Sequence, residues 1–177
     1  MKIFNNKSGF TLIELLVVIS ILSVLGYIAM ADYNGEIKRN RVRIAQETVY
    51  SELQDLRVRV ASGEQNEDVF RCFGLEVTLD SVSRVSAPYD SGCDYNEMTE
   101  DEDLKIASSV PVLSIDDGAL SGAYIFFVPP YGDMEIFNTN MLPITEETTI
   151  VLGHYGYEKS VLINPLTGNI ALNETEE

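Results

Sequence analysis

Residues 9–19 read GFTLIELLVVI and begin the apolar stretch that decides the fold of this chain. Residues 10–31 are apolar or small, apart from one threonine, two serines and a single formal charge on Glu14. A helix of this length is long enough to cross a bilayer. An acidic side chain inside such a helix costs about 2.5–3.5 kcal/mol on insertion, so we expect Glu14 to have a partner and a specific role.

Residues 7–14 read KSGFTLIE, which resembles the processing and methylation signal of type IV prepilins and of the pseudopilins of type II secretion and DNA-uptake machines. In that family a membrane-embedded prepilin peptidase cuts after the glycine and methylates the new N-terminus. The resemblance therefore implies cleavage between Gly9 and Phe10, N-methylation of Phe10 and a role in subunit assembly for Glu14. It also implies that the peptidase and other pilin or pseudopilin subunits are partners.

The chemistry of Glu14 follows from the residues alone. A cut before Phe10 leaves an α-amino group that is normally protonated near neutral pH and lies at the edge of the hydrocarbon. Glu14 lies about one helical turn away, so it can pair with this amine or with the amine of a neighbouring subunit. The second pairing is head-to-tail. When head-to-tail contacts do not close into a ring, they generate a helical filament.

Two other interpretations of this stretch stay open. In the first, Glu14 extends to the cytoplasmic headgroups and has no further role. The second is an ordinary secretory signal, with Lys2 and Lys7 as its positive region and cleavage between Ala31 and Asp32. The apolar run exceeds the roughly 7–15 residues of a signal-peptide core, and a glutamate inside such a core is unusual, so we favour the prepilin interpretation.

The charges that flank the apolar run give conflicting indications of its orientation. Lys2 and Lys7 precede the run, but four basic residues follow it between positions 38 and 43, and basic residues favour the cytoplasmic side. We expect the N-terminus in the cytoplasm, because the prepilin signal requires a cytoplasmic leader. The chain is then a single-pass protein of the bacterial inner membrane that later enters an extracytoplasmic pilus or pseudopilus.

Length and charge limit what the rest of the chain can be. The 177 residues allow an anchor helix and one domain of roughly a hundred residues. The net charge is −16, and after Val85 only Lys105 and Lys159 are basic against seventeen Asp and Glu residues. Because this half repels nucleic acid and lacks basic residues interleaved with aromatics, we expect no direct nucleic-acid binding.

The two cysteines, Cys72 and Cys93, both fall in the part that we expect outside the cytoplasm. In an oxidising compartment, a disulfide between them would contribute about 3 kcal/mol for a loop of this length. Two buried free thiols are the alternative, because spacing alone does not position the Cβ atoms.

A second helical pattern covers residues 36–62. Its apolar residues recur every three or four positions and form one stripe: Val42, Ala45, Val49, Leu53, Leu56 and Val60. No proline precedes Pro88, so we expect the anchor helix to continue into this amphipathic half, although Asn34-Gly35 is a weak point at the junction. Ser62-Gly63 is expected to end the helix.

Beyond Gly63 the sequence changes to short β-like runs separated by turn residues. The runs are 69–79, 104–108, 110–115, 123–128, 134–138, 148–153, 160–164 and 169–172. Because short connections favour antiparallel pairing, we predict an α+β fold. Its long N-terminal helix has a membrane-spanning first half and an amphipathic second half that packs on an antiparallel β-sheet. The domains are a leader at 1–9, a transmembrane half at 10–31, an amphipathic half at 32–62 and a β-rich globular domain at 63–177.

The acidic segment 90–103 is the candidate metal site. Its candidate calcium ligands are Asp94, Asn96, Asp101 and Asp103, because oxygen-rich loops can bind calcium and some pseudopilins do so. The EF-hand pattern is absent, so a solvated loop is the favoured interpretation. His154 is the only histidine, which disfavours zinc, and no catalytic motif is present. We expect no cofactor and no enzymatic activity.

These features predict a structural subunit of a type IV pilus, a type II secretion system or a DNA-uptake filament. Residues 161–170 are similar to the C-terminal hairpin of the GspH/FimT type of minor subunits, although strand-Pro-x-x-Gly-strand is also common turn chemistry. Many major pilins carry a proline in the N-terminal helix that this chain lacks, which favours a minor pilin or pseudopilin. The alternative from another class is a membrane-anchored or secreted binding domain whose acidic face recognises a cationic ligand or calcium.

Overall fold

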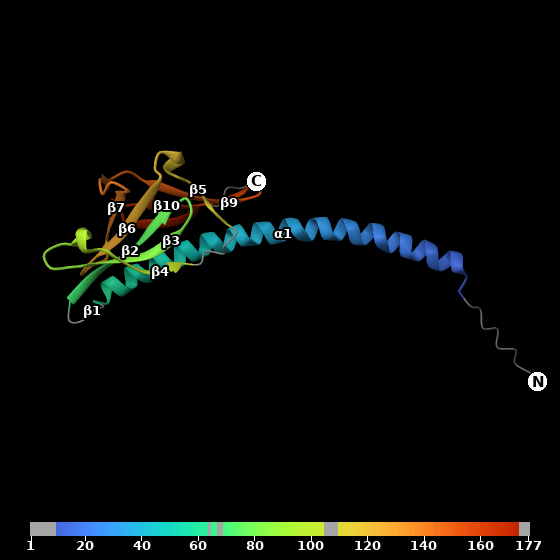
Figure 1. Ribbon diagram of the computed structural model, residues 1–177, viewed down its shortest axis with the longest axis horizontal. Coiled ribbons are helices and arrows are strands. Elements are labelled where there is room, and N and C mark those ends of the chain that lie inside the picture. The colour runs from blue at the N-terminus through green and yellow to red at the C-terminus, as the bar shows by residue number, and fades with distance from the viewer. Residues whose placement is uncertain (1–9, 64, 67–68, 105–109, 174–177) are drawn as a thin grey trace, which may run out of the picture. The chain divides into compact units, whose positions relative to one another are not determined.

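A single helix, α1 (Leu12–Ala61), contains both predicted helical segments (Figure 1). The computed structural model describes residues 10–63, 65–66, 69–104 and 110–173. The helix continues through Asn34-Gly35, so this dipeptide does not end it. It ends as predicted at Ser62-Gly63, where Gly63 adopts a φ of 73° and donates its backbone N–H to the Val60 carbonyl at 3.0 Å.

The chain divides into two compact units within α1, between Ile37 and Lys38. In the first unit, the large apolar side chains of α1 from Leu12 to Met30 are exposed. The helix is long and apolar enough to cross a membrane by length and composition. Ser20 and Ser23 donate their hydroxyls to the carbonyls of Leu16 and Ile19 at 2.6 and 2.7 Å, so these polar groups are satisfied within the helix.

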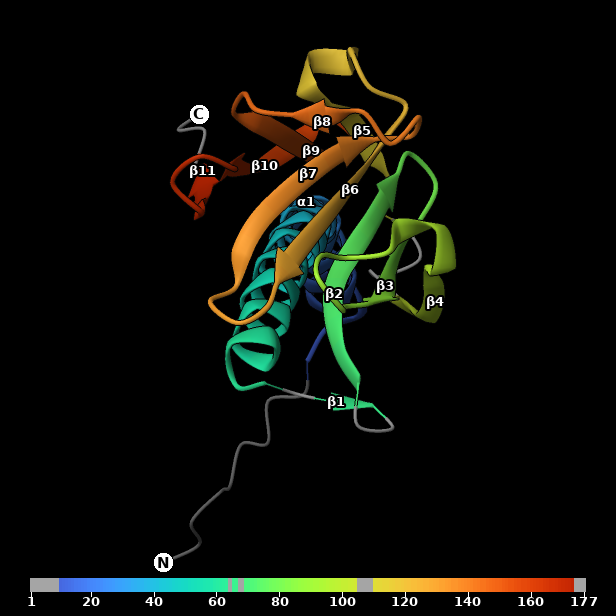
Figure 2. The ribbon, with the colours of Figure 1, turned by 90° about the vertical axis from the view of Figure 1, so that its left-hand side faces the viewer.

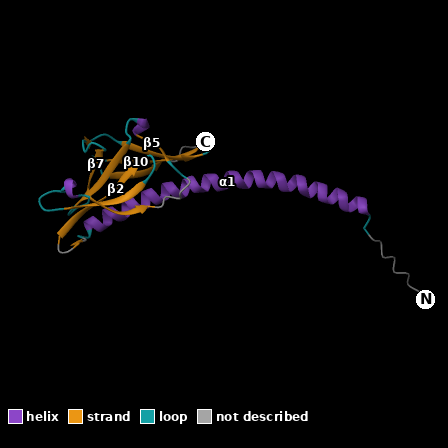
Figure 3. Ribbon diagram, viewed as in Figure 1, coloured by secondary structure: helices purple, strands orange, loops and turns teal. Residues whose placement is uncertain are grey.

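In the second unit, the remainder of α1 packs on two antiparallel sheets (Figure 2). The first sheet has the strand order β4-β3-β2-β6-β7-β8, with β1 paired to β2, and the second has the order β11-β10-β9-β5. The strands are β1 (Gln65–Asn66), β2 (Val69–Thr78), β3 (Val82–Pro88), β4 (Thr99–Leu104), β5 (Val112–Ile115), β6 (Gly122–Val128), β7 (Asp133–Asn138), β8 (Pro143–Ile144), β9 (Thr148–His154), β10 (Tyr157–Asn164) and β11 (Asn169–Asn173). Two short 3₁₀ helices, η1 (Tyr95–Glu97) and η2 (Asp116–Gly118), lie in the connections (Figure 3).

The α+β fold class is confirmed. All six residues of the predicted helical stripe are buried, and they form one core with inward-facing residues of both sheets. We predicted one sheet under the helix, and the structure has two. The second sheet adds residues such as Ile150, Val161 and Ile163 to the core, so the apolar stripe is covered by strands from both halves of the domain.

Four of the described strands were not predicted: the two-residue strands β1 and β8, and the longer strands β3 and β4. β3 was missed, because serines and an arginine interrupt its apolar residues, although Val82 and Val85 are buried on opposite faces of the sheet. β4 (TEDEDL) was assigned to the acidic loop, yet it forms an edge strand paired with β3. Charged residues on an edge strand discourage further pairing. The predicted run 104–108 begins at the last residue of β4, and its remainder lies outside the described residues.

Hydrogen bonds from polar side chains connect α1 to both sheets. Gln46 is 3% exposed, and its Nε2 donates to the carbonyls of Ser160 at 2.7 Å and Asn173 at 3.3 Å. Glu52 accepts hydrogen bonds from Arg84 of β3 in a half-buried ion pair. Nη1 of Arg57 donates to the Gly168 carbonyl at 2.9 Å in the turn between β10 and β11. These bonds fix the rotation of the helix relative to both sheets.

A substitution at Gly74 can test how closely the strands of the first sheet pack. It lies in β2 between β3 and β6, and an added Cβ would overlap the carbonyl oxygen of Ile125 and lie 2.8 Å from Cδ1 of Phe126. Because that oxygen belongs to the backbone, it cannot move without disturbing the sheet. We expect Gly74→Ala to lower the free energy of unfolding by about 1–3 kcal/mol. Thermal unfolding of the full chain in detergent micelles, followed by circular dichroism, measures the change.

Gly92→Ala is the matched control, because nothing lies within 4 Å of the position of an added Cβ at Gly92. The control variant should unfold at the wild-type temperature. Equal melting temperatures for both variants would show that β2 and β6 do not approach as closely as described.

Candidate functional site

The first turn of α1 carries a reciprocal pair of hydrogen-bonding residues, Thr11 and Glu14. Oε2 of Glu14 accepts hydrogen bonds from the backbone N–H and the hydroxyl of Thr11, both at 2.8 Å. The backbone N–H of Glu14 donates in return to Oγ1 of Thr11 at 3.3 Å. This arrangement is a capping box, in which residues three positions apart satisfy backbone donors that the helix leaves free at its start.

The capping box gives Glu14 a partner in its own chain, which the sequence analysis did not identify. The signal was present as Thr11-x-x-Glu14 before an apolar run, the known sequence pattern of a capping box. The carboxylate also lies at the positive end of the helix dipole, where a negative charge is stabilised. The geometry therefore holds the Glu14 carboxylate in a defined position at the entrance of the apolar segment.

The structure places the other residues predicted for processing as follows. Phe10 precedes the helix and is 85% exposed. Gly9 lies outside the described residues, so the predicted cleavage between Gly9 and Phe10 stays a prediction. The assembly role of Glu14 also stays a prediction, which the capping geometry neither requires nor opposes.

In the second unit, Cys72 of β2 and Cys93 are joined by a disulfide, with a Cα–Cα distance of 6.0 Å. The disulfide holds the segment after β3 over the face of the first sheet that points away from α1. A small second core forms there from Cys72, Val85, Ala87 and Phe126. The ring of Tyr95 closes this core, with its centroid 4.8 Å from each of the rings of Phe126 and Phe137.

Two tyrosines of this face donate hydrogen bonds to carboxylates. Burial and the hydrogen bond to Glu135 raise the pKa of Tyr95 well above its ordinary value. Burial and the hydrogen bond to Glu76 raise the pKa of Tyr124 to about 12. Both hydroxyls therefore stay protonated at neutral pH. Because the folded-state pKa of Tyr124 is raised, its contribution to stability is complete below pH of about 10 and is lost as the pH rises through about 12.

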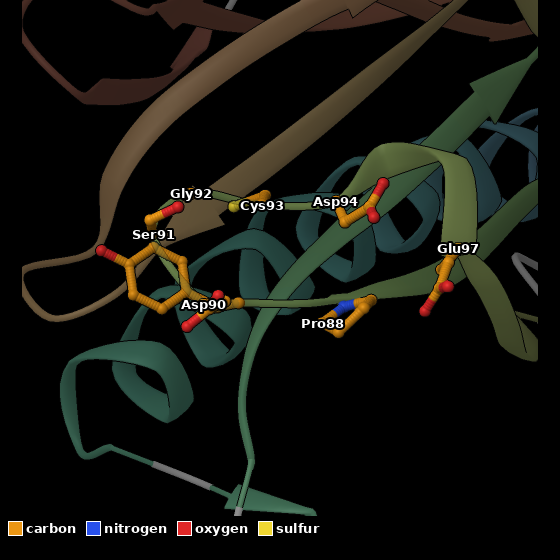
Figure 4. A pocket seen from close by; sticks show the side chains of 8 residues that line it. Pro88, Asp90, Ser91, Gly92, Cys93, Asp94 and Glu97 are labelled. Carbon is orange, nitrogen blue, oxygen red and sulfur yellow. The ribbon is translucent and has the colours of Figure 1, made fainter.

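An open depression of about 490 Å³ lies beside the disulfide, lined by Pro88, Tyr89, Asp90, Ser91, Gly92, Cys93, Asp94 and Glu97 (Figure 4). Of the predicted calcium ligands, Asp94 lines this depression, and Asn96 lies next to it in η1. Oδ1 of Asp94 accepts hydrogen bonds from the backbone N–H of Asn96 at 3.0 Å and from its Nδ2 at 3.1 Å, which caps η1. The Asp94 carboxylate thus has a local structural role.

The other two predicted ligands, Asp101 and Asp103, lie in β4, and their side chains are outside the described part of the chain. Among the side chains that are described, no group of three or more His, Cys, Asp or Glu is arranged to hold a metal ion. Calcium binding by this segment stays an untested prediction.

Removal of the disulfide should destabilise the second unit. The two cysteines are 21 positions apart in sequence. A disulfide that closes a loop of this length stabilises the folded state by about 3 kcal/mol, because it lowers the entropy of the unfolded chain. We expect Cys72→Ala with Cys93→Ala to lower the free energy of unfolding by about that amount, measured by circular dichroism of the full chain in detergent.

Wild-type protein treated with a reductant is the control and should unfold like the double variant. The double variant should not respond further to the reductant. A double variant as stable as the oxidised wild type would contradict the structural role given to this bond.

Comparison with known proteins gives two matches. Residues 4–30 match the family model described as a prokaryotic N-terminal methylation motif. Over 87 residues the chain is 33% identical to a fimbrial protein of Moraxella nonliquefaciens, an alignment that covers 48% of this chain and 52% of that protein. The chain therefore spans about half the length of the curated relative that it matches. No solved structure matches the chain at a significant level.

Proposed function

From the N-terminal methylation motif and the similarity to a fimbrial protein, we propose that the chain is a type IV pilin-like structural subunit of a pilus or pseudopilus, without enzymatic activity of its own. It is made as a precursor with a cytoplasmic leader and anchored in the inner membrane by α1. The prepilin peptidase cuts it between Gly9 and Phe10 and methylates Phe10. The mature subunit then joins other pilin or pseudopilin subunits through packed N-terminal helices.

The observation that carries this proposal is the position of the Glu14 carboxylate. It is the one formal charge in the apolar segment, and a charge in such a place needs a cationic partner to be stabilised in hydrocarbon. The proposed cut supplies that partner, because it creates an α-amino group at Phe10 of each subunit. The methylation motif at residues 4–30 supports such a cut.

The capping box is compatible with this role. Both hydrogen bonds that Thr11 donates are accepted by Oε2 of Glu14, and a carboxylate has about four lone-pair sites. An ammonium group of a neighbouring subunit can therefore bind the same carboxylate while the capping bonds are kept. Because Thr11 already orders the side chain, less conformational entropy is lost when the neighbour binds.

A minor position in the filament is supported by two features. No proline precedes Pro88, and α1 is continuous from Leu12 to Ala61. The antiparallel hairpin of β10 and β11 has the form expected for the C-terminal hairpin of the GspH/FimT type, although such hairpins are common. Quantification of the subunit in purified filaments decides between a minor and a major component.

The central test separates the charge of Glu14 from its capping role. Glu14→Gln keeps a side-chain acceptor at the position that a capping box requires but removes the negative charge. We expect the variant to be cut and methylated normally, because the cleavage site is unchanged. We expect its recovery in sheared filaments to fall by at least about tenfold, which corresponds to about 1.4 kcal/mol per subunit contact.

The measurements are the mass and N-terminal sequence of the mature protein from native membranes, together with immunoblots of sheared filaments. Glu36→Ala is the matched control, because it removes an acidic residue from the same helix beyond the apolar run and should leave recovery unchanged. Normal recovery of Glu14→Gln in filaments would refute the proposed contact. A mature N-terminus at Asp32 would instead indicate a secreted domain.

A further inference from the structure

Aromatic and basic side chains meet at the start of the second unit, where α1 lies beside the β9–β10 hairpin. Nζ of Lys38 lies 4.3 Å from the centre of the Tyr155 ring, and Cζ of Arg39 lies 4.9 Å from the centre of the Tyr157 ring. Both are cation–π contacts. We call Lys38, Arg39, Arg41, Tyr155 and Tyr157 the basic collar.

The backbone of Tyr155 is in an unusual conformation for a bulky residue. Tyr155 and Gly156 form the two-residue turn between β9 and β10, with φ values of 52° and 85°. A turn with both φ values positive favours Asn, Asp or Gly at its first position, and a tyrosine there is strained. The ring is nevertheless 71% exposed. A large aromatic group held at a strained turn and exposed to solvent points to a role in binding.

The collar differs in charge from the rest of the molecule. The chain carries −16 overall, yet four of its twelve basic residues lie between positions 38 and 43. Arg43 is paired with Glu47 at 2.8 Å and is not part of the collar. Other acidic residues near the collar are Glu36 on α1 and Glu158 on β10. An anionic surface would therefore attract the basic collar and repel the acidic faces of the domain.

The position of the collar along the chain matches the surface of a membrane. Lys38 lies seven positions after Ala31, the end of the apolar run, which is roughly 10 Å along a helix. The headgroup layer extends roughly 5–8 Å beyond the hydrocarbon, and lysine and arginine side chains span the remaining distance. Tyrosine rings favour this same layer.

We propose that the basic collar binds the phosphate groups of anionic phospholipids on the membrane face where α1 emerges, and that it thereby orients the domain before the subunit enters a filament. Ammonium and guanidinium groups bind phosphate oxygens through charge-assisted hydrogen bonds. The tyrosine rings hold the two cations in place and lie among the headgroups. This inference rests on the proposed anchoring of α1 in the membrane.

The chain contains no tryptophan, so a single tryptophan can report on each site. Tyr155→Trp keeps an aromatic face for Lys38. Tyr131→Trp is the matched control, because Tyr131 is 78% exposed and lies in the β6–β7 turn, where Gly132 lies against Arg57 near the other end of the helix. The full chain is reconstituted into vesicles of pure phosphatidylcholine or of phosphatidylcholine and phosphatidylglycerol in a ratio of three to one. Brominated lipids in these vesicles quench the tryptophan fluorescence.

We expect quenching of Tyr155→Trp to rise at least about twofold in the anionic vesicles and to return to the phosphatidylcholine level in high salt. Tyr131→Trp should not respond to lipid charge. Lys38→Gln with Arg41→Gln, added to Tyr155→Trp, should abolish the rise. Arg59→Gln with Arg71→Gln removes the same charge elsewhere in the domain and should leave the rise unchanged. Circular dichroism confirms that each variant is folded.

Flotation of the vesicles separates the two proposals. A chain that does not float with the vesicles would refute both the membrane anchor and the collar. A chain that floats while quenching of Tyr155→Trp is the same in both lipids would refute the collar alone. A blue shift that follows protein density at fixed lipid composition would assign the surface to a second copy of the chain, and would also refute lipid binding.

Discussion

Burial of one apolar stripe on α1 is the interaction on which the domain depends. The residues of this stripe are Val42, Ala45, Val49, Leu53, Leu56 and Val60, and each is almost completely buried. Burying a side chain of this kind contributes about 1.5–3 kcal/mol, and the inner faces of both sheets close around the stripe. No described strand of one sheet pairs with a strand of the other. The stripe on the helix belongs to one core with residues of both sheets.

The same helix has two different surfaces along its length. Up to Met30 the large apolar side chains are exposed on all sides, which suits hydrocarbon. From Val42 onward the buried apolar residues form one stripe, while Ile44 and Val58 are exposed. The Thr11–Glu14 capping box and the two serine hydroxyls satisfy polar groups of the first half within the helix, as a helix in hydrocarbon requires.

Polar contacts give this core a defined geometry. Gln46 binds carbonyls of β10 and β11, and Arg84 of β3 reaches Glu52, so the helix has a specific partner in each sheet. On the far side of the first sheet, the disulfide and Tyr95 close a smaller second core around Phe126. Acidic residues such as Glu76 and Glu135 accept hydrogen bonds from tyrosines there, so part of the high negative charge is used in structure.

The helix, its buried stripe, its end at Gly63 and most strands could be predicted from the sequence, because periodicity and capping are local properties of the chain. The motif at Gly9 and Phe10 is local too, and so is the Thr11–Glu14 pattern that was overlooked. The missed β3, the charged edge strand β4, the second sheet, the Cys72–Cys93 bond and the meeting of Lys38 with Tyr155 were decided only by the tertiary structure. β3 forms a hairpin with the neighbouring strand β2, but its serines and arginine hide the apolar pattern. The other features depend on residues farther apart in sequence, and local pattern carries no information about which of them pair.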